Sequence, residues 1–208
     1  ITDDIPKTIE KVLKHTCVDQ ETYVHFINWL AYIFQKRDRT ETAWVFQGTQ
    51  GTGKGFVFNQ IIRRIFGPEY TRPITLNTLQ DNFNDFIENK FFIFVDEIDI
   101  EHSGPGSSQG KVMNKLKNLI TEPTIAMRGM YKSTKDKRNY ANFIFASNDV
   151  AALYINENDR RFNVAPRQEE KLESVVSRTD LDLLIKYEID AFAAFLKGFP
   201  VNEKKART

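Results

Sequence analysis

The sequence predicts an α/β fold in which helices flank a mostly parallel β-sheet, with helical segments at both ends of the chain. A glycine-rich segment, residues 48–55, separates a short apolar run from a helix-like run. Five consecutive apolar residues at 91–95 have the length of a strand buried on both faces, as in parallel sheets covered by helices. A similar run at 143–146 also ends in polar residues. Open sheets of this kind bind ligands at the carboxyl ends of their strands, so we expect functional residues there.

The composition narrows the class of protein. The chain has 208 residues, 41% of them hydrophobic, which suffices for one sizeable core. Its net charge is +1, so any affinity for a polyanion must come from a local basic patch. Cys17 is the only cysteine, so the sequence has no internal disulfide framework, which fits a reducing cytosol.

Targeting signals are not recognisable in the sequence. It has no run of about 18 apolar residues and no signal peptide, so we expect a cytoplasmic protein without a membrane anchor. Because the first residue is not Met, we expect the chain to be part of a longer protein. The expected segments are an N-terminal helical segment at 1–40, a core at 41–167 and a C-terminal helical segment at 168–208.

Hydrophobic periodicity predicts the helices of the two end segments. A short amphipathic helix is expected at 7–14, after Pro6. Asp19 is a suitable N-cap for a longer helix at 20–35, whose apolar residues recur every three to four positions. The same spacing at 180–197 predicts a C-terminal helix, followed by a polar tail.

Residues 48–55 have the sequence of a phosphate-binding P-loop. Strand, glycine-rich loop, lysine and helix follow one another in the order that such a loop requires. The glycines let backbone N–H groups turn inward around an anion, and the next helix adds the positive end of its dipole. The predicted nucleotide-binding residues are Gly48, Thr49, Gln50, Gly51, Thr52, Gly53, Lys54 and Gly55.

One residue of this loop departs from the usual pattern. Lys54 is placed to reach the β- and γ-phosphates of a triphosphate. Gly55, however, stands where a Ser or Thr hydroxyl normally ligates Mg²⁺. The alternative to a P-loop is a glycine-rich turn with Lys54 solvated, but the flanking strand and helix patterns favour the P-loop.

The predicted elements after the loop alternate between helix and strand. A helix is expected at 56–66, ended by Gly67, and a short strand at 73–76. A helix starting at Asn77 or Thr78 is expected to continue to Phe86.

Asp96 and Glu97 directly follow the buried strand at 91–95. In a nucleotide site, Asp96 would hold Mg²⁺, and Glu97 would orient and deprotonate the attacking water. Two carboxylates after a strand can also simply cap the next segment. Their position about 40 residues after a P-loop favours the catalytic interpretation.

The region from Lys111 to Tyr140 is strongly basic. It holds eight Lys and Arg residues against two carboxylates. We expect a helix at 111–120 after a flexible loop, and then two apolar strands, at 124–128 and 140–146, flanking a basic hairpin. Met130, Tyr131 and Tyr140 interleave apolar and aromatic surface with the charge, as single-stranded nucleic acid prefers. A solvated, charge-rich turn is the alternative.

Further polar residues are candidates for contacts with the nucleotide. Asn148 lies just beyond the strand at 143–146, where its amide could contact the γ-phosphate or the catalytic water. Arg160 and Arg161 follow about a dozen residues later and are candidates for a transition-state arginine. Exposed arginines near a surface strand also form ordinary salt bridges, and this alternative stays open.

The order of these motifs resembles that of a superfamily 3 helicase. GTQGTGKG, FFIFVDE, the basic hairpin, FIFASN and DRRF follow one another between residues 44 and 166. The chain looks most like the helicase portion of phage and plasmid primase-helicases, including phage primase-polymerases. The resemblance implies an AAA+-type α/β domain that binds ATP and Mg²⁺ and assembles into hexameric rings around single-stranded DNA. It also implies a primase or polymerase module, covalently linked or as a partner.

The resemblance assigns roles only to positions that match its motifs. Lys54 matches the P-loop lysine, Asp96 the Mg²⁺ ligand and Glu97 the residue that activates water. Asn148 matches the sensor asparagine, and Arg160, with Arg161 second, the arginine finger given to the neighbouring subunit. The residues that match the DNA-gripping region are Arg128, Lys132, Lys135, Lys137 and Arg138.

Three interpretations follow from these patterns. The first is an ATP-driven DNA helicase motor, and the second is an AAA+ ATPase that remodels other proteins without separating strands. The third is a weakly hydrolysing ring that serves as a scaffold for a primase or polymerase. Gly55 favours the third, whereas the complete set of other motif residues argues against it.

Overall fold

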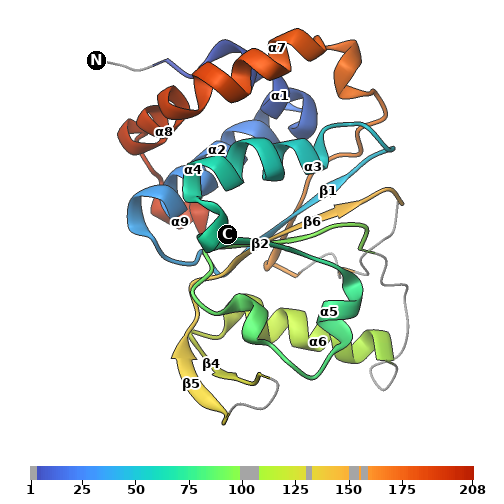
Figure 1. The fold of residues 1–208 in the computed structure, drawn as a ribbon, viewed down its shortest axis with the longest axis vertical. Coiled ribbons are helices and arrows are strands. Elements are labelled where there is room, and N and C mark those ends of the chain that lie inside the picture. Colours follow the sequence, from blue (N-terminus) through green and yellow to red (C-terminus); the bar gives the residue numbers. More distant parts are fainter. Residues whose placement is uncertain (1–3, 99–107, 130–132, 150–154, 156–158) are drawn as a thin grey trace.

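Five parallel strands form the central sheet, and this sheet confirms the predicted α/β fold (Figure 1). The structure is a computed structural model that describes residues 4–98, 108–129, 133–149, 155 and 159–208. The strand order is β2-β3-β6-β1-β7, and each neighbouring pair is parallel. The strands are β1 (Ala43–Gln47), β2 (Thr71–Ile74), β3 (Phe92–Val95), β6 (Asn142–Ser147) and β7 (Phe162–Val164).

Helices cover both faces of this sheet (Figure 1). The helical segments on one face are α1 (Lys7–Cys17), α2 (Gln20–Lys36), α3 (Lys54–Phe56), η1 (Val57–Ile62), α4 (Arg63–Phe66), α7 (Arg178–Leu183), η5 (Leu184–Glu188) and α8 (Ile189–Gly198). Those on the other face are α5 (Leu76–Gln80), η3 (Asp85–Ile87) and α6 (Ser108–Thr121). The remaining short elements are η2 (Pro68–Tyr70), η4 (Leu172–Ser174), α9 (Glu203–Ala206) and the strands β4 (Thr124–Met127) and β5 (Lys135–Arg138).

The central strands divide their side chains between two apolar cores, because successive residues of a strand point to opposite faces. In β1, Trp44 and Phe46 pack into the core formed with α1, α2 and α8. Ala43 and Val45 belong to the core formed with α5 and α6. The strands β3 and β6 divide their residues in the same way. Burial on both faces explains why they appear in the sequence as continuous apolar runs.

The helical segments at the two ends of the chain pack on the same face of the sheet. Asp19 caps α2 as predicted, since its carboxylate accepts a hydrogen bond from the backbone N–H of Thr22 at 2.7 Å. Gln35 of α2 donates to the carbonyl oxygen of Leu196 in α8 at 2.8 Å. Residues from all three predicted segments contribute to this core, and the boundaries at 40 and 167 stay a prediction.

The predicted arrangement of the basic hairpin is wrong. The strand β4 pairs antiparallel with β5, the basic stretch itself, in a separate two-stranded sheet. The following apolar run becomes β6 at the centre of the main sheet, where all six of its residues are buried. Solvent-exposed β5 carries no apolar pattern, so only its backbone pairing makes it a strand.

Four smaller boundaries also differ from the prediction. The helix expected to reach Phe86 ends at Gln80, and Lys115 donates to the carbonyl oxygens of Leu79 in its last turn and of Asp81 and Phe83 beyond it. The short strand expected at 73–76 lies at Thr71–Ile74. The helix after the glycine-rich loop already starts at Lys54 and has a π-helical stretch. The polar tail contains the short helix α9, which Asn202 caps. Within the described residues, no helix is long and apolar enough to span a membrane.

Candidate nucleotide site

The carboxyl edge of the sheet gathers three of the predicted motifs. Because β1, β3 and β6 are parallel, the residues that follow them lie on the same edge: Gly48, Asp96 and Asn148. The glycine-rich loop, both carboxylates and Asn148 line one cavity of about 360 Å³. Leu172, Glu173 and Leu181 of the C-terminal segment complete its wall.

The loop needs glycine at particular positions. Gly51 and Gly53 have φ values of +87° and +97°, a left-handed conformation that side chains other than glycine rarely adopt. A Cβ on Gly48 would lie 2.4 Å from the carbonyl oxygen of Gln168. The loop is therefore shaped both by its own backbone and by the segment that passes beside it.

Lys54 is nearly buried at the start of the helix. Its Nζ donates to the carbonyl oxygens of Gly48 and Thr49 at 2.6 and 3.0 Å, and to Asn148 Oδ1 at 3.1 Å. Burial lowers the pKa of Lys54, and the charge of Arg167 acts in the same direction, while Asp96 opposes both. The ammonium group is thus held between the loop and Asn148, at the wall of the cavity.

Asp96 and Glu97 form an exposed turn after β3. Glu97 has a φ of +52°, and its N–H donates to Asp96 Oδ1 at 3.1 Å. Left-handed backbone at a residue other than glycine is uncommon and occurs often at functional sites. Ile98 then donates to the carbonyl oxygen of Ala146 at 3.0 Å, which fixes the turn against β6.

The donor set fits an ion that keeps several of its waters. No group of three or more His, Cys, Asp or Glu residues that could hold a metal occurs in the described part of the chain. Mg²⁺ is usually bound by one or two carboxylates together with phosphate oxygens and water. Asp96, beside the loop, can provide one such carboxylate. Thr52 does not replace the missing hydroxyl of Gly55, because its Oγ1 donates to the carbonyl oxygen of Thr49.

The segment that follows β7 also borders this site, and no sequence motif indicated it. Arg167 Nη1 donates to the backbone oxygen of Asn148 at 2.9 Å. Thr49 N–H donates to Gln168 O at 3.1 Å, and Leu172 N–H to Gly51 O at 2.9 Å. This segment follows β7, which has only three residues. So short a run is not recognisable as a strand in the sequence, and the position of the segment beside the loop could not be predicted.

Arg160 and Arg161 lie away from these groups. They precede β7, so they are at the amino edge of the sheet, opposite the glycine-rich loop. Arg161 Nη1 contacts both carboxylate oxygens of Asp159 at 3.1 Å, whereas the side chain of Arg160 is exposed. Both arginines line a hollow of about 650 Å³, together with Lys117 and Arg207.

Asp159 neutralises part of this basic group. Its carboxylate also binds Lys117 at 2.9 Å. Burial alone would raise the pKa of Asp159, but the hydrogen bonds and charges of Lys117 and Arg161 hold it below its usual value. In the described structure Arg160 forms no ion pair, so of the two arginines it is the one better able to contact a neighbouring molecule.

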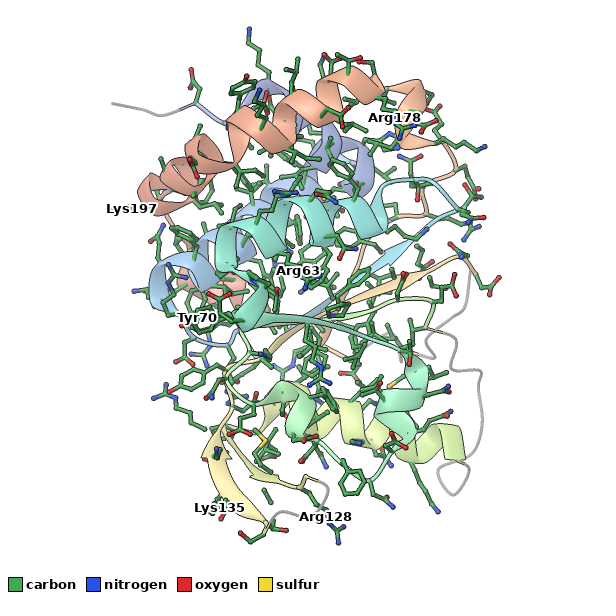
Figure 2. The ribbon with its side chains drawn as sticks, viewed as in Figure 1. Arg63, Tyr70, Arg128, Lys135, Arg178 and Lys197 are labelled. Carbon is green, nitrogen blue, oxygen red and sulfur yellow. The ribbon has the colours of Figure 1, made fainter. Side chains whose placement is uncertain are left out.

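The predicted DNA-binding residues are divided between two environments. Arg128 and Lys135 are exposed near the tip of the β4–β5 hairpin (Figure 2), and among the described residues neither has an ion-pair partner. Lys137 pairs with Glu88, and Arg138 with Asp38 at 2.9 Å. Lys132, Met130 and Tyr131 lie outside the described residues.

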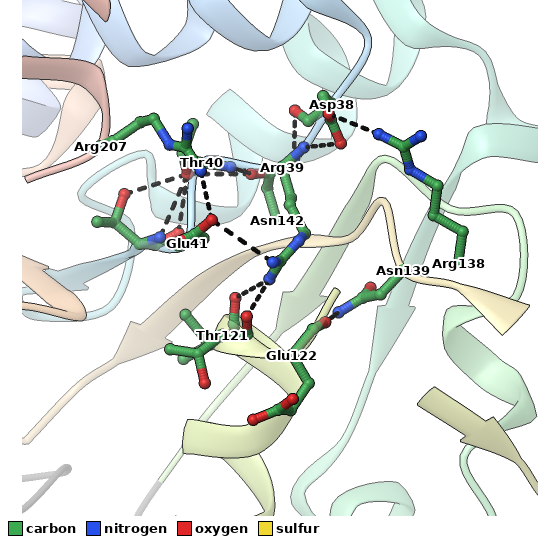
Figure 3. A network of polar contacts seen from close by, with 12 residues as sticks. Asp38, Arg39, Thr40, Glu41, Thr121, Glu122, Arg138, Asn139, Asn142 and Arg207 are labelled. Carbon is green, nitrogen blue, oxygen red and sulfur yellow. Dashed lines mark hydrogen bonds and ion pairs between the residues drawn. The ribbon is translucent and has the colours of Figure 1, made fainter. Parts of the chain in front are cut away.

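A polar network ties the base of the hairpin to the entry of β1 (Figure 3). Arg39 donates to the carbonyl oxygens of Thr121 and Ile120 at 2.5 and 3.2 Å. The neighbouring Asp38 holds Arg138. The base of the hairpin is therefore anchored to the main sheet, whereas its tip extends away from it (Figure 2).

Comparisons with known proteins agree with this fold. The chain belongs to the family of unknown function DUF5906, whose profile matches residues 46–161, more than half of the chain. It is 31% identical over 203 residues to the DNA primase-polymerase of Nitratiruptor phage NrS-1. The alignment covers 97% of this chain and 28% of that protein. The predicted resemblance to phage primase-polymerases is thereby confirmed.

Solved structures show the same relationship. The apo structure of the NrS-1 C-terminal region has a TM-score of 0.86 at 29% identity, covering 99% of this chain and 49% of that one. Its A form has a TM-score of 0.85 at 29% identity, covering 98% and 48%. The chain thus spans about half the length of the solved region and a smaller part of the curated relative.

Proposed function

We propose that the chain is the ATP-dependent helicase motor of a phage or plasmid replication protein, which hydrolyses ATP to move along single-stranded DNA and unwind duplex. The observation that supports this most strongly is the gathering of Lys54, Asp96, Glu97 and Asn148 around one cavity at the carboxyl edge. Each of these residues has a chemical role that phosphoryl transfer requires.

The residues divide the chemistry among them. Backbone N–H groups of the loop and the helix N-terminus bind the phosphates, and Lys54 contacts the terminal ones. Asp96 would hold Mg²⁺, which would neutralise charge on the phosphate oxygens. Glu97 accepts a proton from the attacking water, and the amide of Asn148 orients that water against the γ-phosphate.

Assembly completes the site in this proposal. Arg160 lies at the edge opposite the loop, so it can act on the nucleotide of a neighbouring subunit in a hexameric ring. The exposed cations of the hairpin, Arg128 and Lys135, contact the DNA backbone. Because the NrS-1 relative is a primase-polymerase, a primase or polymerase module is the proposed linked partner, in the cytoplasm of the host.

A second candidate function is a weakly hydrolysing ring that acts as a scaffold for such a module. Gly55 favours it, since no hydroxyl stands at the end of the loop to ligate Mg²⁺. A protein-remodelling ATPase is the third candidate. The pairing of Lys137 and Arg138 with carboxylates favours it, because it leaves fewer cations for DNA.

The deciding experiment measures ATP turnover with and without single-stranded DNA, alongside native mass. Stimulation by DNA supports the helicase motor. Turnover that DNA does not change indicates the protein-remodelling ATPase, and a ring without turnover indicates the scaffold.

A mixing experiment tests the arginine finger within the same assay. Arg160→Ala should bind ATP but lose about 10³-fold or more in turnover. Adding Lys54→Ala protein should restore part of it, because one type of interface then combines an intact loop with an intact arginine. No recovery in confirmed mixed oligomers would assign the role to Arg161 or to another residue.

A further inference from the structure

Arg167 lies on the segment after β7, at the carboxyl edge of the sheet. The backbone beyond β7 continues beside β1, since Ala165 N–H donates to Val45 O and Gln168 N–H to Gln47 O, both at 2.9 Å. Residue 167 therefore sits on hydrogen-bonded backbone next to the glycine-rich loop. Its half-buried side chain is directed toward Asn148.

A continuous set of contacts joins Arg167 to Lys54. Asn148 Oδ1 accepts from Lys54 Nζ at 3.1 Å, and the backbone oxygen of the same residue accepts from Arg167 Nη1 at 2.9 Å. One cation thus holds the side chain of Asn148, and another holds its backbone. Asn148 is itself exposed, beyond the end of β6, where Asp149 N–H donates to Ser147 Oγ at 2.9 Å, and its contacts with Lys54 and Arg167 add to this turn.

Asn148 lies between two cations, with carboxylates in the same cavity. Lys54 and Arg167 carry two positive charges around one neutral amide, and the charge of Asp96 acts on Lys54 from the same cavity, where Mg²⁺ would neutralise it. Arg167 Nε contacts Glu169 Oε1 at 2.5 Å, which offsets part of this charge from the outer side. Lys54 reaches the β- and γ-phosphates in P-loop proteins, so the γ-phosphate would lie on the side of Lys54 that faces Asn148.

From this geometry we propose that Arg167 is a positioning residue that enables the site to distinguish ATP from ADP. It fixes Asn148 at the distance from Lys54 where the amide meets the γ-phosphate, and so favours the nucleotide that carries this phosphate. The inference rests on the proposed nucleotide site, and it adds the residue that links the γ-phosphate to the segment after β7.

The test compares affinities for two nucleotides in the full 208-residue chain. Calorimetry with Mg²⁺ measures the dissociation constants of ADP and of a non-hydrolysable ATP analogue for the parent, Arg167→Ala and Arg167→Gln. We expect both variants to lose about tenfold in affinity for the ATP analogue, the effect of one charge-assisted hydrogen bond, and less than about twofold for ADP. Arg167→Lys should retain most of the discrimination.

The controls separate this role from a structural one. Arg64→Ala removes an exposed arginine of α4 that contacts Gln60 and should change neither affinity. Equal losses for the two nucleotides, or no loss, in a folded Arg167→Gln variant would overturn the inference and leave the proposed function intact. A parent chain that binds neither nucleotide would overturn the proposed function, and this inference with it.

Discussion

The two edges of the central sheet carry charged residues in different ways. At the carboxyl edge, Lys54, Asp96, Glu97 and Asn148 surround one cavity, and backbone hydrogen bonds fix the loop that they share. At the amino edge, cations are largely paired with carboxylates of the same chain: Arg161 and Lys117 with Asp159, Arg138 with Asp38, and Lys137 with Glu88.

This difference indicates which edge needs a partner molecule to complete its function. The carboxyl edge contains the groups that we propose to bind and activate a nucleotide. The amino edge presents only a few unpaired cations among the described residues, such as Arg160, and a partner must reach them. We therefore expect substitutions at the carboxyl edge to have larger effects in the isolated chain than substitutions at the amino edge or in the hairpin.

Glu97→Gln should produce the largest effect on turnover. The amide cannot accept the proton of the attacking water, so hydrolysis should fall by about 10² to 10⁴-fold, while ATP binding is retained. Steady-state ATPase assays and calorimetry measure the two properties. Glu173→Gln is the matched control, because Glu173 lines the same cavity from the C-terminal segment. Parent-like hydrolysis by Glu97→Gln would exclude the proposed role of this carboxylate.

Gly48→Ala should have the second largest effect, because it disrupts the glycine-rich loop. The new Cβ would lie 2.4 Å from the backbone oxygen of Gln168, so the loop and the neighbouring segment must separate. We expect a loss of about 1–3 kcal/mol in the free energy of unfolding and weaker nucleotide binding. Gly198→Ala is the control, since nothing lies within 4 Å of its added Cβ. Equal melting temperatures for the two variants would mean that the contact is not rigid.

In the hairpin, Lys135→Ala should weaken binding of single-stranded DNA more than Lys137→Ala. Lys135 is unpaired within the described structure, whereas the ammonium of Lys137 already contacts Glu88. Loss of one phosphate contact should lower the slope of log affinity against log salt by about 0.7. Fluorescence anisotropy across a salt series measures this slope. Equal slopes for the parent and Lys135→Ala would make the hairpin a solvated turn.

Gly55→Ser should have the smallest effect. The nearest atom to an added Cβ is Asn59 Nδ2 at 3.9 Å, so a serine side chain fits without displacing its neighbours. Because Mg²⁺ readily keeps water ligands, the parent should bind Mg²⁺ with ATP, and the variant should bind it as well or better. Titration of Mg²⁺ in the presence of ATP measures this difference. A weaker Mg²⁺ affinity in the variant would show that this position does not face the ion.

The residues of the carboxyl edge were predictable because their signal is local. Asp96 and Asn148 each follow an apolar strand, and parallel strands bring their carboxyl ends together. Arg167 was not predictable, since β7 is three residues long and its edge position depends on pairing with β1. The ion pairs of Asp159 and Glu88 join residues that are distant in the sequence, so no local pattern indicated that they would neutralise part of the basic surface.

Calorimetric titration of ATP tests most directly whether the carboxyl edge is a nucleotide site. The titration is carried out on the parent chain and on Lys54→Ala, each with Mg²⁺ and with a chelator. We expect Mg²⁺-dependent binding to the parent that is strongly reduced in Lys54→Ala, because the variant loses a charged contact with the phosphates. Absence of Mg²⁺-dependent binding to the folded parent would contradict the proposed motor function and favour the scaffold.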